Sequence, residues 1–143
     1  MIAPALKRRM VDCPAWRISP QDSNYMALVF DPRDDGCGLV AVLEIFEPAG
    51  RTPPNVHLQA SEFFFVLHGE GRARAGGDWL PLAAGDALMV RPGVEHVIEN
   101  TGPGKLYCLT VMSPDEDFAR AVREGTPVQL DAADRRVIGG LVD

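Results

Sequence analysis

Two segments of the chain concentrate side chains that can bind a metal or take part in catalysis. Residues 50–69 carry His57 and Glu62, and residues 85–100 carry His96. Imidazole nitrogens and carboxylate oxygens are common protein donors to divalent transition metals. Glu62 begins an aromatic run, and an unpaired carboxylate is costly to bury, so it needs a cation or a hydrogen-bond partner. These three residues are therefore the first candidates for a functional site.

The first segment resembles the first of the two motifs of the cupin superfamily. That motif runs Gly, five residues, His-x-His, three or four residues, Glu, six residues, Gly. In this chain four residues separate His57 from Glu62, and six separate Glu62 from Gly69. His57 thus occupies the second histidine position of the motif, and Glu62 occupies the glutamate position.

The second segment resembles the second cupin motif, which runs Gly, five residues, Pro-x-Gly, two residues, His, three residues, Asn. Residues 85–100 match every spacing, with Arg91 in place of the first proline. The resemblance covers roughly residues 38–112. It implies that His57, Glu62 and His96 are metal ligands, without identifying any catalytic residue.

The register of the first motif decides the fourth ligand. With His57 second, the first position falls on Asn55, and Ala49 stands where the motif has its upstream glycine. The alternative register makes His57 first and Gln59 second, but leaves only two residues before Glu62. We prefer Asn55 as the fourth ligand and keep Gln59 as an alternative ligand or a polar residue of the pocket.

The types of ligating side chain indicate which metal such a site would bind and what reactions it would support. Residues i and i+2 of a strand share a face, so Asn55 and His57 can point into a barrel together. Two imidazoles and one carboxylate form a facial triad that suits Fe(II) and leaves positions free for substrate and oxygen. An amide oxygen is a weak neutral ligand, so Asn55 binds metal weakly or orients the ligands from outside.

Other residues near the motifs can be interpreted as either functional or structural. Arg91 is a substrate-binding candidate for a carboxylate or phosphate group, or a rim ion-pair partner. Phe64 shares the strand face of Glu62 and provides either an apolar pocket wall or core packing. We expect His68, at a strand end, to face solvent, and Asn100 to bond to the local backbone in a turn.

Short apolar runs punctuated by 14 glycines and 12 prolines are typical of a β-sandwich or barrel. Such closely spaced strands pair as antiparallel hairpins, because parallel crossovers need a dozen or more residues. With the cupin resemblance, this predicts an all-β fold, a double-stranded β-helix (jelly-roll) barrel with a short C-terminal helical tail. The expected strands cover residues 39–46, 63–67, 72–75, 79–82, 87–90, 95–98 and 106–112.

We expect residues 1–143 to form a single domain, with the barrel core at about 25–112 and the helical tail at about 114–139. Ser113, Pro114 and Glu116 have the spacing of a capping box, which predicts a helix from Ser113 to about Gly125. A second short helix is expected to begin near Asp131 and Asp134 and to end near residues 139–140. Nothing in this tail indicates catalysis.

Composition limits the possible partners. The apolar content of 46% and charged content of 24% are those of a globular protein. The net charge of −6 disfavours nucleic acids and anionic membranes as partners. Cys13, Cys37 and Cys108 have no paired spacing, and no apolar segment has the length of a signal peptide or a membrane span. We therefore expect a cytoplasmic protein without a disulfide framework, in which Cys108 is a small buried apolar residue.

The resemblance implies a homodimer and a small-molecule ligand or substrate, but no particular reaction. One hypothesis is a metal-dependent enzyme, dioxygenase-like or an isomerase or lyase, that uses Fe, Mn, Ni or Zn on a small oxygenated organic molecule. The second is a non-catalytic binding or sensing protein with a degenerate site, which Asn55 would favour. A structural dimer without ligand would leave the grouping of Glu62 with two histidines unexplained.

Overall fold

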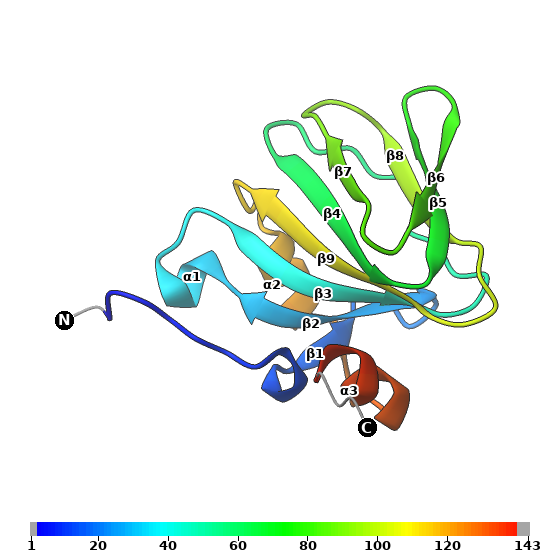
Figure 1. Cartoon of the computed structure of the whole chain (residues 1–143). Coiled ribbons are helices and arrows are strands. Elements are labelled where there is room, and N and C mark those ends of the chain that lie inside the picture. Colours follow the sequence, from blue (N-terminus) through cyan, green and yellow to red (C-terminus); the bar gives the residue numbers. More distant parts are fainter. Residues whose placement is uncertain (1–2, 140–143) are drawn as a thin grey trace.

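The computed structural model describes residues 3–139 of the chain (Figure 1). Ten strands, three α-helices and one 3-10 helix follow one another in this part. In chain order they are η1 (Met10–Asp12), β1 (Ala15–Arg17), β2 (Asn24–Phe30), α1 (Pro32–Asp35), β3 (Val40–Phe46), β4 (Ser61–His68), β5 (Glu70–Ala75), β6 (Trp79–Ala83), β7 (Ala87–Val90), β8 (His96–Asn100), β9 (Leu106–Ser113), α2 (Phe118–Arg123), β10 (Thr126–Val128) and α3 (Ala132–Ile138).

The strands form two sheets that face each other. The larger has seven strands in the order β10-β1-β2-β3-β9-β4-β7, and the smaller has three in the order β6-β5-β8. Every pair is antiparallel. The segment before β4 extends the smaller sheet, because Arg51 and Asn55 form bridges with Glu99 and His96 of β8. The predicted antiparallel jelly-roll barrel with a helical tail is confirmed.

Side chains alternate between the barrel interior and its outer surface, as β-strand geometry requires. In β4, Phe64 and Val66 are buried, whereas Phe63, Phe65 and Leu67 are exposed. The interior apolar cluster joins both sheets. It contains Phe46, Phe64, Val66, Ala73, Leu82, Val90, Ile98, Leu106 and Cys108.

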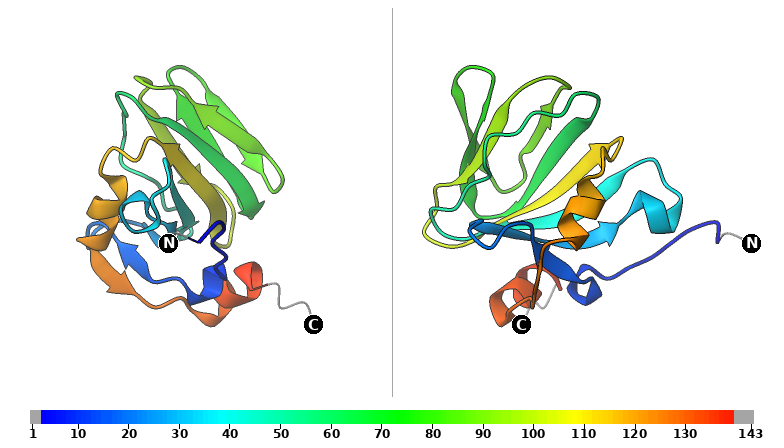
Figure 2. Two further views of the ribbon diagram at one scale, coloured as in Figure 1. Left: turned by 90° about the vertical axis from the view of Figure 1, so that its left-hand side faces the viewer. Right: turned by 180° about the vertical axis from the view of Figure 1, so that it is seen from behind.

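Terminal segments cover part of the larger sheet. Helix α2 packs on the cluster formed by Met26, Leu28, Val42 and neighbouring residues. Helix α3 lies beside η1 on another cluster that includes Tyr25 and Leu43. Both helices lie against the part of the molecule formed by β1 to β3, away from the three-stranded sheet (Figure 2).

All seven strands expected from the sequence are present, with ends that differ by at most two residues. Strands β1, β2 and β10 were not expected from the sequence. Strands β1 and β10 have three residues each and pair with each other although they are far apart in the sequence, with Ala15 opposite Val128. Strand β2 lacks alternation because six of its seven residues are buried.

The expected start of the first tail helix is wrong. Ser113 is the last residue of β9, where it pairs with Ser61, and its hydroxyl donates to the carbonyl of Gly38 at 3.0 Å. The helix α2 begins only at Phe118. Glu116 does not cap the helix, because its carboxylate accepts hydrogen bonds from the backbone just before β4. Ser113 and Glu116 thus have the spacing of a capping box, but each bonds to a residue far away in the sequence.

The second tail helix agrees with its prediction. Asp131 is the N-cap of α3, and its side chain and that of Asp134 form a reciprocal capping box. The helix ends at Ile138 with Gly139 as its C-cap, while Gly140 lies outside the described residues.

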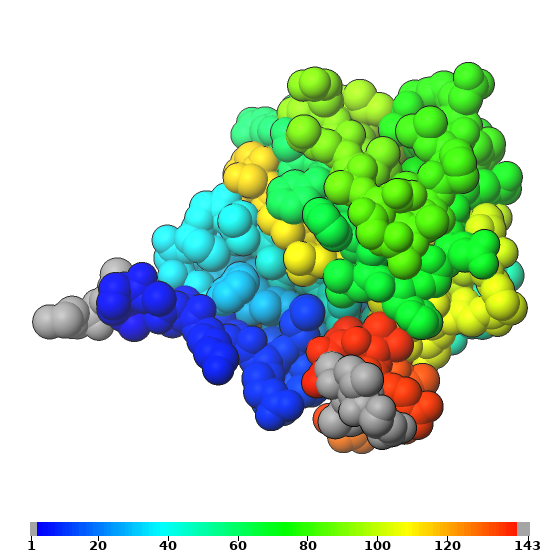
Figure 3. Space-filling model, viewed as in Figure 1, coloured from blue at the N-terminus to red at the C-terminus, as the bar shows by residue number. Residues whose placement is uncertain are grey.

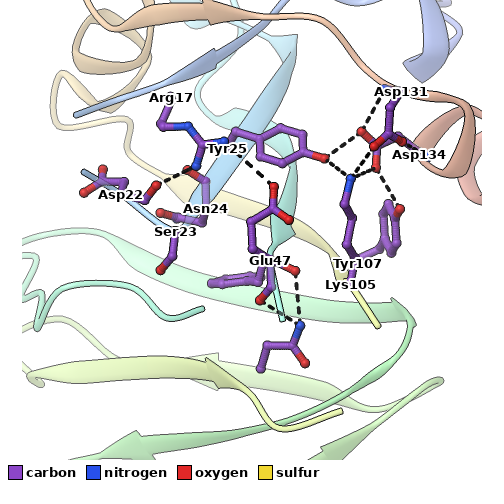
Figure 4. A network of polar contacts seen from close by, with 12 residues as sticks. Arg17, Asp22, Ser23, Asn24, Tyr25, Glu47, Lys105, Tyr107, Asp131 and Asp134 are labelled. Atoms are coloured by element: carbon purple, nitrogen blue, oxygen red, sulfur yellow. Dashed lines mark hydrogen bonds and ion pairs between the residues drawn. The ribbon is translucent and has the colours of Figure 1, made fainter. Parts of the chain in front are cut away.

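A buried polar network attaches α3 to the large sheet (Figure 4). The Asp134 carboxylate is fully buried and accepts hydrogen bonds of 2.7 Å from the hydroxyls of both Tyr25 and Tyr107. Lys105 donates to Asp134 at 3.2 Å and to Asp131 at 2.6 Å. The charge of Asp134 is therefore compensated by a cation and by hydrogen-bond donors from two strands.

The three cysteines are free thiols. Cys108 is completely buried, and burial raises the pKa of its thiol, so it serves as a small core residue as expected. Within residues 3–139, no helix is long and apolar enough to cross a membrane.

Candidate metal centre

Glu62 and His96 meet inside the barrel, from facing sheets. Glu62 lies near the start of β4 and His96 is the first residue of β8, and both are buried. His96 Nε2 lies 2.8 Å from Glu62 Oε1, and its other ring nitrogen, Nδ1, lies 3.1 Å from the carbonyl of Val94. A proton on Nδ1 donated to this carbonyl leaves Nε2 as the donor to a metal, an arrangement common among metal-binding histidines.

His57 completes the cluster from the segment between β3 and β4. Its Nε2 lies 3.4 Å from Glu62 Oε1, and its ring centroid lies 5.4 Å from that of His96. The donor atoms of His57, Glu62 and His96 all lie within 4.8 Å of one another. Two imidazole nitrogens and a carboxylate converging from three segments fit a divalent transition metal in number, type and separation.

Without a metal, the charges of Glu62 and His96 stabilise each other. Burial alone would lower the pKa of His96, but its contacts with Glu62 and the Val94 carbonyl raise it above the ordinary value. Burial alone would raise the pKa of Glu62, but its contacts with His57 and His96 lower it. Each residue therefore favours the charged form of the other, and a bound metal cation would interact with the same Glu62 carboxylate and His96 Nε2.

Asn55 lies directly across from His96. The backbone N–H of Asn55 donates to the carbonyl of His96 at 3.0 Å, and that of His96 donates to Asn55 at 2.8 Å. Directly paired residues of antiparallel strands project to the same face, so the side chain of Asn55 shares the face of the His96 imidazole. Asn55 is half-buried, and alternation places His57 on the same face.

The backbone explains the glycine positions of the two motifs. Ala49, where the preferred register expects glycine, has a φ of 62°, in the left-handed region that favours glycine. Gly93, in the turn before β8, has a φ of 80°, and its N–H donates to the carbonyl of His57 at 2.7 Å. This turn therefore ties the His57 segment to the strand that carries His96.

The remaining candidate residues occupy different environments. Phe64 is buried, with its ring centroid 6.2 Å from that of His96, so it forms an apolar wall beside the cluster. Gln59 and Arg91 are exposed, unlike the buried Glu62 and His96. His68 is exposed at the far end of β4, as expected. Asn100 ends β8 and donates to the local carbonyl of Gly104 at 2.8 Å, as expected, but also to the distant carbonyls of Phe46 and Glu47 at 3.1 and 3.0 Å.

A second buried acid, Glu44 of β3, lies inside the barrel and was not expected from the sequence. Its carboxylate accepts hydrogen bonds from Asn24 Nδ2 at 2.7 Å and from Thr110 Oγ1 at 3.0 Å. Burial and the nearby charge of Glu62 raise the pKa of Glu44 to about 7. A single glutamate within the apolar run 39–46 was the signal that could have identified it.

A groove of about 580 Å³ lies elsewhere, between the N-terminal segment and the residues around α1 and α2. It contains Asp31, whose buried carboxylate is already bonded to Arg33 and Arg123. None of the three cluster residues lines this groove. The buried acid of this groove is thus already paired with two arginines, and the groove is separate from the three-residue cluster.

Comparison with known families agrees with this geometry. The family model described as a cupin domain matches residues 42–112, which include the whole cluster. The chain belongs to the cupin superfamily. No curated protein matches this cupin significantly by sequence.

Solved structures share the cupin fold. A predicted oxalate decarboxylase from Thermotoga maritima is 24% identical, with a TM-score of 0.69 and coverage of 76% of this chain and 99% of that one. An RmlC-like cupin from Shewanella frigidimarina is 25% identical, with a TM-score of 0.58 and coverage of 69% and 84%. An oxalate oxidase in complex with glycolate is 18% identical, with a TM-score of 0.63 and coverage of 76% of this chain and 59% of that one.

Proposed function

We propose that this cupin is a metal-dependent enzyme that acts on a small oxygenated organic molecule. The observation that carries the proposal is the convergence of His57, Glu62 and His96, whose donor atoms lie within 4.8 Å of one another. These residues would hold Fe, Mn, Ni or Zn, with Asn55 as a weak fourth ligand or a positioning residue.

Each residue has a distinct part in this site. Glu62 supplies the negative charge that a divalent cation requires, and the carbonyl of Val94 orients the ring of His96. Phe64 presents an apolar surface that limits water beside the cluster. A metal held here supplies Lewis-acid polarisation of a substrate oxygen, or redox chemistry with dioxygen.

The substrate class rests on the donor set and on the fold relatives. Open coordination positions bind a carboxylate, carbonyl or hydroxyl oxygen, so small hydroxy and oxo acids fit the site. Glycolate, present in the oxalate oxidase complex, is a hydroxy acid, and oxalate is a small dicarboxylate with the same kinds of oxygen donor. Oxidation by a dioxygenase-type reaction is our first candidate, followed by isomerase or lyase chemistry.

Asn55 supports a second candidate, a non-catalytic binding or sensing protein. An amide in place of an imidazole weakens the site, so such a protein would bind metal or ligand without turnover. The two candidates differ in whether the metal-loaded protein consumes dioxygen or changes a small acid.

A homodimer is also part of the proposal, with the outer face of β4 and β7 as the contact. Phe63, Phe65, Leu67 and Met89 are 39–60% exposed there. Figure 3 shows this side of the larger sheet, where the N-terminal segment and α3 cover only the lower part. We further propose a cytoplasmic protein, since its three cysteines are free and two of them are buried.

The test is metal content in protein purified without a nickel column. We expect near-stoichiometric transition metal in the wild-type protein and its loss in His57→Ala and His96→Ala. His68→Ala is the matched control, because His68 is exposed at the far end of β4. A metal-free wild type whose melting temperature does not respond to Fe(II), Mn(II), Ni(II) or Zn(II) would contradict the proposal.

The metal-loaded protein is then incubated with small hydroxy, oxo and dicarboxylic acids, including glycolate and oxalate. Dioxygen uptake identifies oxidative chemistry, and product analysis without dioxygen identifies isomerase or lyase chemistry. Saturable ligand binding with no turnover of any acid would favour the second candidate.

A further inference from the structure

The chain between His57 and Glu62 is the least supported part of the metal site. Glu62 and His96 belong to strands, whereas His57 lies outside any regular element. Leu58 is 78% exposed and Gln59 is exposed, so packing does little to hold this bend. The position of the His57 imidazole therefore depends on the polar contacts of its neighbours.

One carboxylate from the C-terminal tail supplies such contacts. Glu116 accepts hydrogen bonds from two consecutive backbone N–H groups, that of Gln59 at 3.2 Å and that of Ala60 at 2.9 Å. Charge-assisted hydrogen bonds of this type are stronger than neutral ones. Glu116 thus fixes the direction of the chain two residues after His57 and two residues before Glu62.

The backbone of the tail holds Glu116 in place. Glu116 and Asp117 have φ angles of 50° and 63°, in the left-handed region that non-glycine residues rarely adopt. On either side, Ser113 pairs with Ser61 in the sheet and Ala119 packs against the cluster that contains Ala60. Such conformations persist where the surrounding structure imposes them.

We infer that Glu116 is a positioning residue of the metal centre, which holds the Gln59–Ala60 backbone so that His57 faces Glu62 and His96. This inference rests on the proposed metal function. It assigns to the C-terminal tail a role in the site, although the tail contributes no metal donor. The opposite side of the segment is fixed by the bond from Gly93 to the His57 carbonyl.

The test compares Glu116→Ala and Glu116→Gln with the wild type. The control is Glu124→Ala, which removes another exposed glutamate of the tail, whose one ion pair within residues 3–139 is with Arg120. Co(II) is the probe, because its visible absorption reports the coordination geometry. We expect Glu116→Ala to weaken Co(II) binding about 10-fold and to change the spectrum. Glu116→Gln, whose amide oxygen accepts one N–H, should have a smaller effect, and Glu124→Ala should match the wild type.

A second pair of measurements uses the metal-free protein. In Glu116→Ala, the amides of Gln59 and Ala60 should exchange with solvent faster, and the His57 imidazole resonances should shift. His68 is the internal reference, since it lies at the far end of β4. Should Glu116→Ala fail to fold, Glu116→Gln provides the same comparison.

The outcomes separate the two proposals. Unchanged Co(II) affinity and spectrum in a folded Glu116→Ala variant would overturn the role of Glu116 while leaving the metal function intact. A wild-type protein that binds no metal would overturn the proposed function. The exchange and imidazole data would then decide the positioning role: changes at Gln59, Ala60 and His57 would support it, and their absence would overturn it.

Discussion

Asn55 and His96 form a directly opposed backbone pair, joined by hydrogen bonds of 3.0 and 2.8 Å. This pairing places the Asn55 side chain on the same face as the His96 imidazole. Asn55 thus places an amide beside the metal-binding cluster, at a position from which a histidine side chain would reach the same site.

Replacement of Asn55 by histidine should therefore strengthen metal binding. We expect Asn55→His to raise the affinity for Zn(II) or Ni(II) by about 10-fold, because an imidazole is a better ligand than an amide oxygen. The measurement is a competition titration against a chelator of known affinity. Gln59→His is the control for the alternative register, and it should give no increase in metal affinity because Gln59 is exposed to solvent. A larger gain from Gln59→His would show that the register is wrong.

Glu44→Gln should stabilise the metal-free protein at neutral and alkaline pH. Folding raises the pKa of Glu44 from 4.5 to about 7, so the folded state favours its protonated form. The stabilising contribution of this proton is complete below pH 4.5 and is lost as the pH rises through about 7. As the pH rises across this range, the free energy of unfolding of the variant should come to exceed that of the wild type by up to about 3 kcal/mol.

Urea unfolding from pH 4.5 to 8 measures this difference for Glu44→Gln. The amide oxygen of the variant can keep the bond from Asn24 Nδ2, while its N–H can donate to the hydroxyl oxygen of Thr110. Glu70→Gln, at an exposed position, should follow the wild-type pH dependence. If the free energies of unfolding of Glu44→Gln and the wild type differ by the same amount at every pH, Glu44 does not titrate in this range.

Asp134→Ala should strongly destabilise the protein. The change leaves Tyr25, Tyr107 and Lys105 without the carboxylate that they share in the interior. We expect a loss of about 3 kcal/mol, which lowers the melting temperature by about 10 °C. Calorimetry measures the change, and Asp78→Ala, at an exposed position, should have little effect. Equal melting temperatures for the two variants would refute the anchoring role of Asp134.

Phe65→Glu should disrupt the proposed homodimer. Phe65 is 44% exposed on the outer face of β4, and a charge there cannot be buried against a second copy without a large desolvation cost. Light scattering after size exclusion should show a wild-type dimer and a variant monomer. Leu80→Glu, on β6 of the other sheet, is the control and should remain dimeric. A wild type that is monomeric at all concentrations would exclude the dimer.

The sequence by itself determined the features that depend on neighbouring residues. Short apolar runs and turn residues predicted seven of the ten strands, and Asp131 with Asp134 indicated the start of α3. The motif spacings identified His57, Glu62 and His96 before their convergence was known, because a jelly-roll of fixed strand order brings these positions together. The short strands β1 and β10 escaped prediction because only their pairing with each other and with β2 defines them.

Only the tertiary structure decided which distant groups meet. Glu116 had the spacing of a helix cap, but its partners, Gln59 and Ala60, lie 57 and 56 residues away. Glu44 acquires its raised pKa from burial and from Glu62, neither of which local sequence describes. Hydrogen bonds and charges act over a few ångströms in space and not along the chain, so the roles of these carboxylates follow from packing.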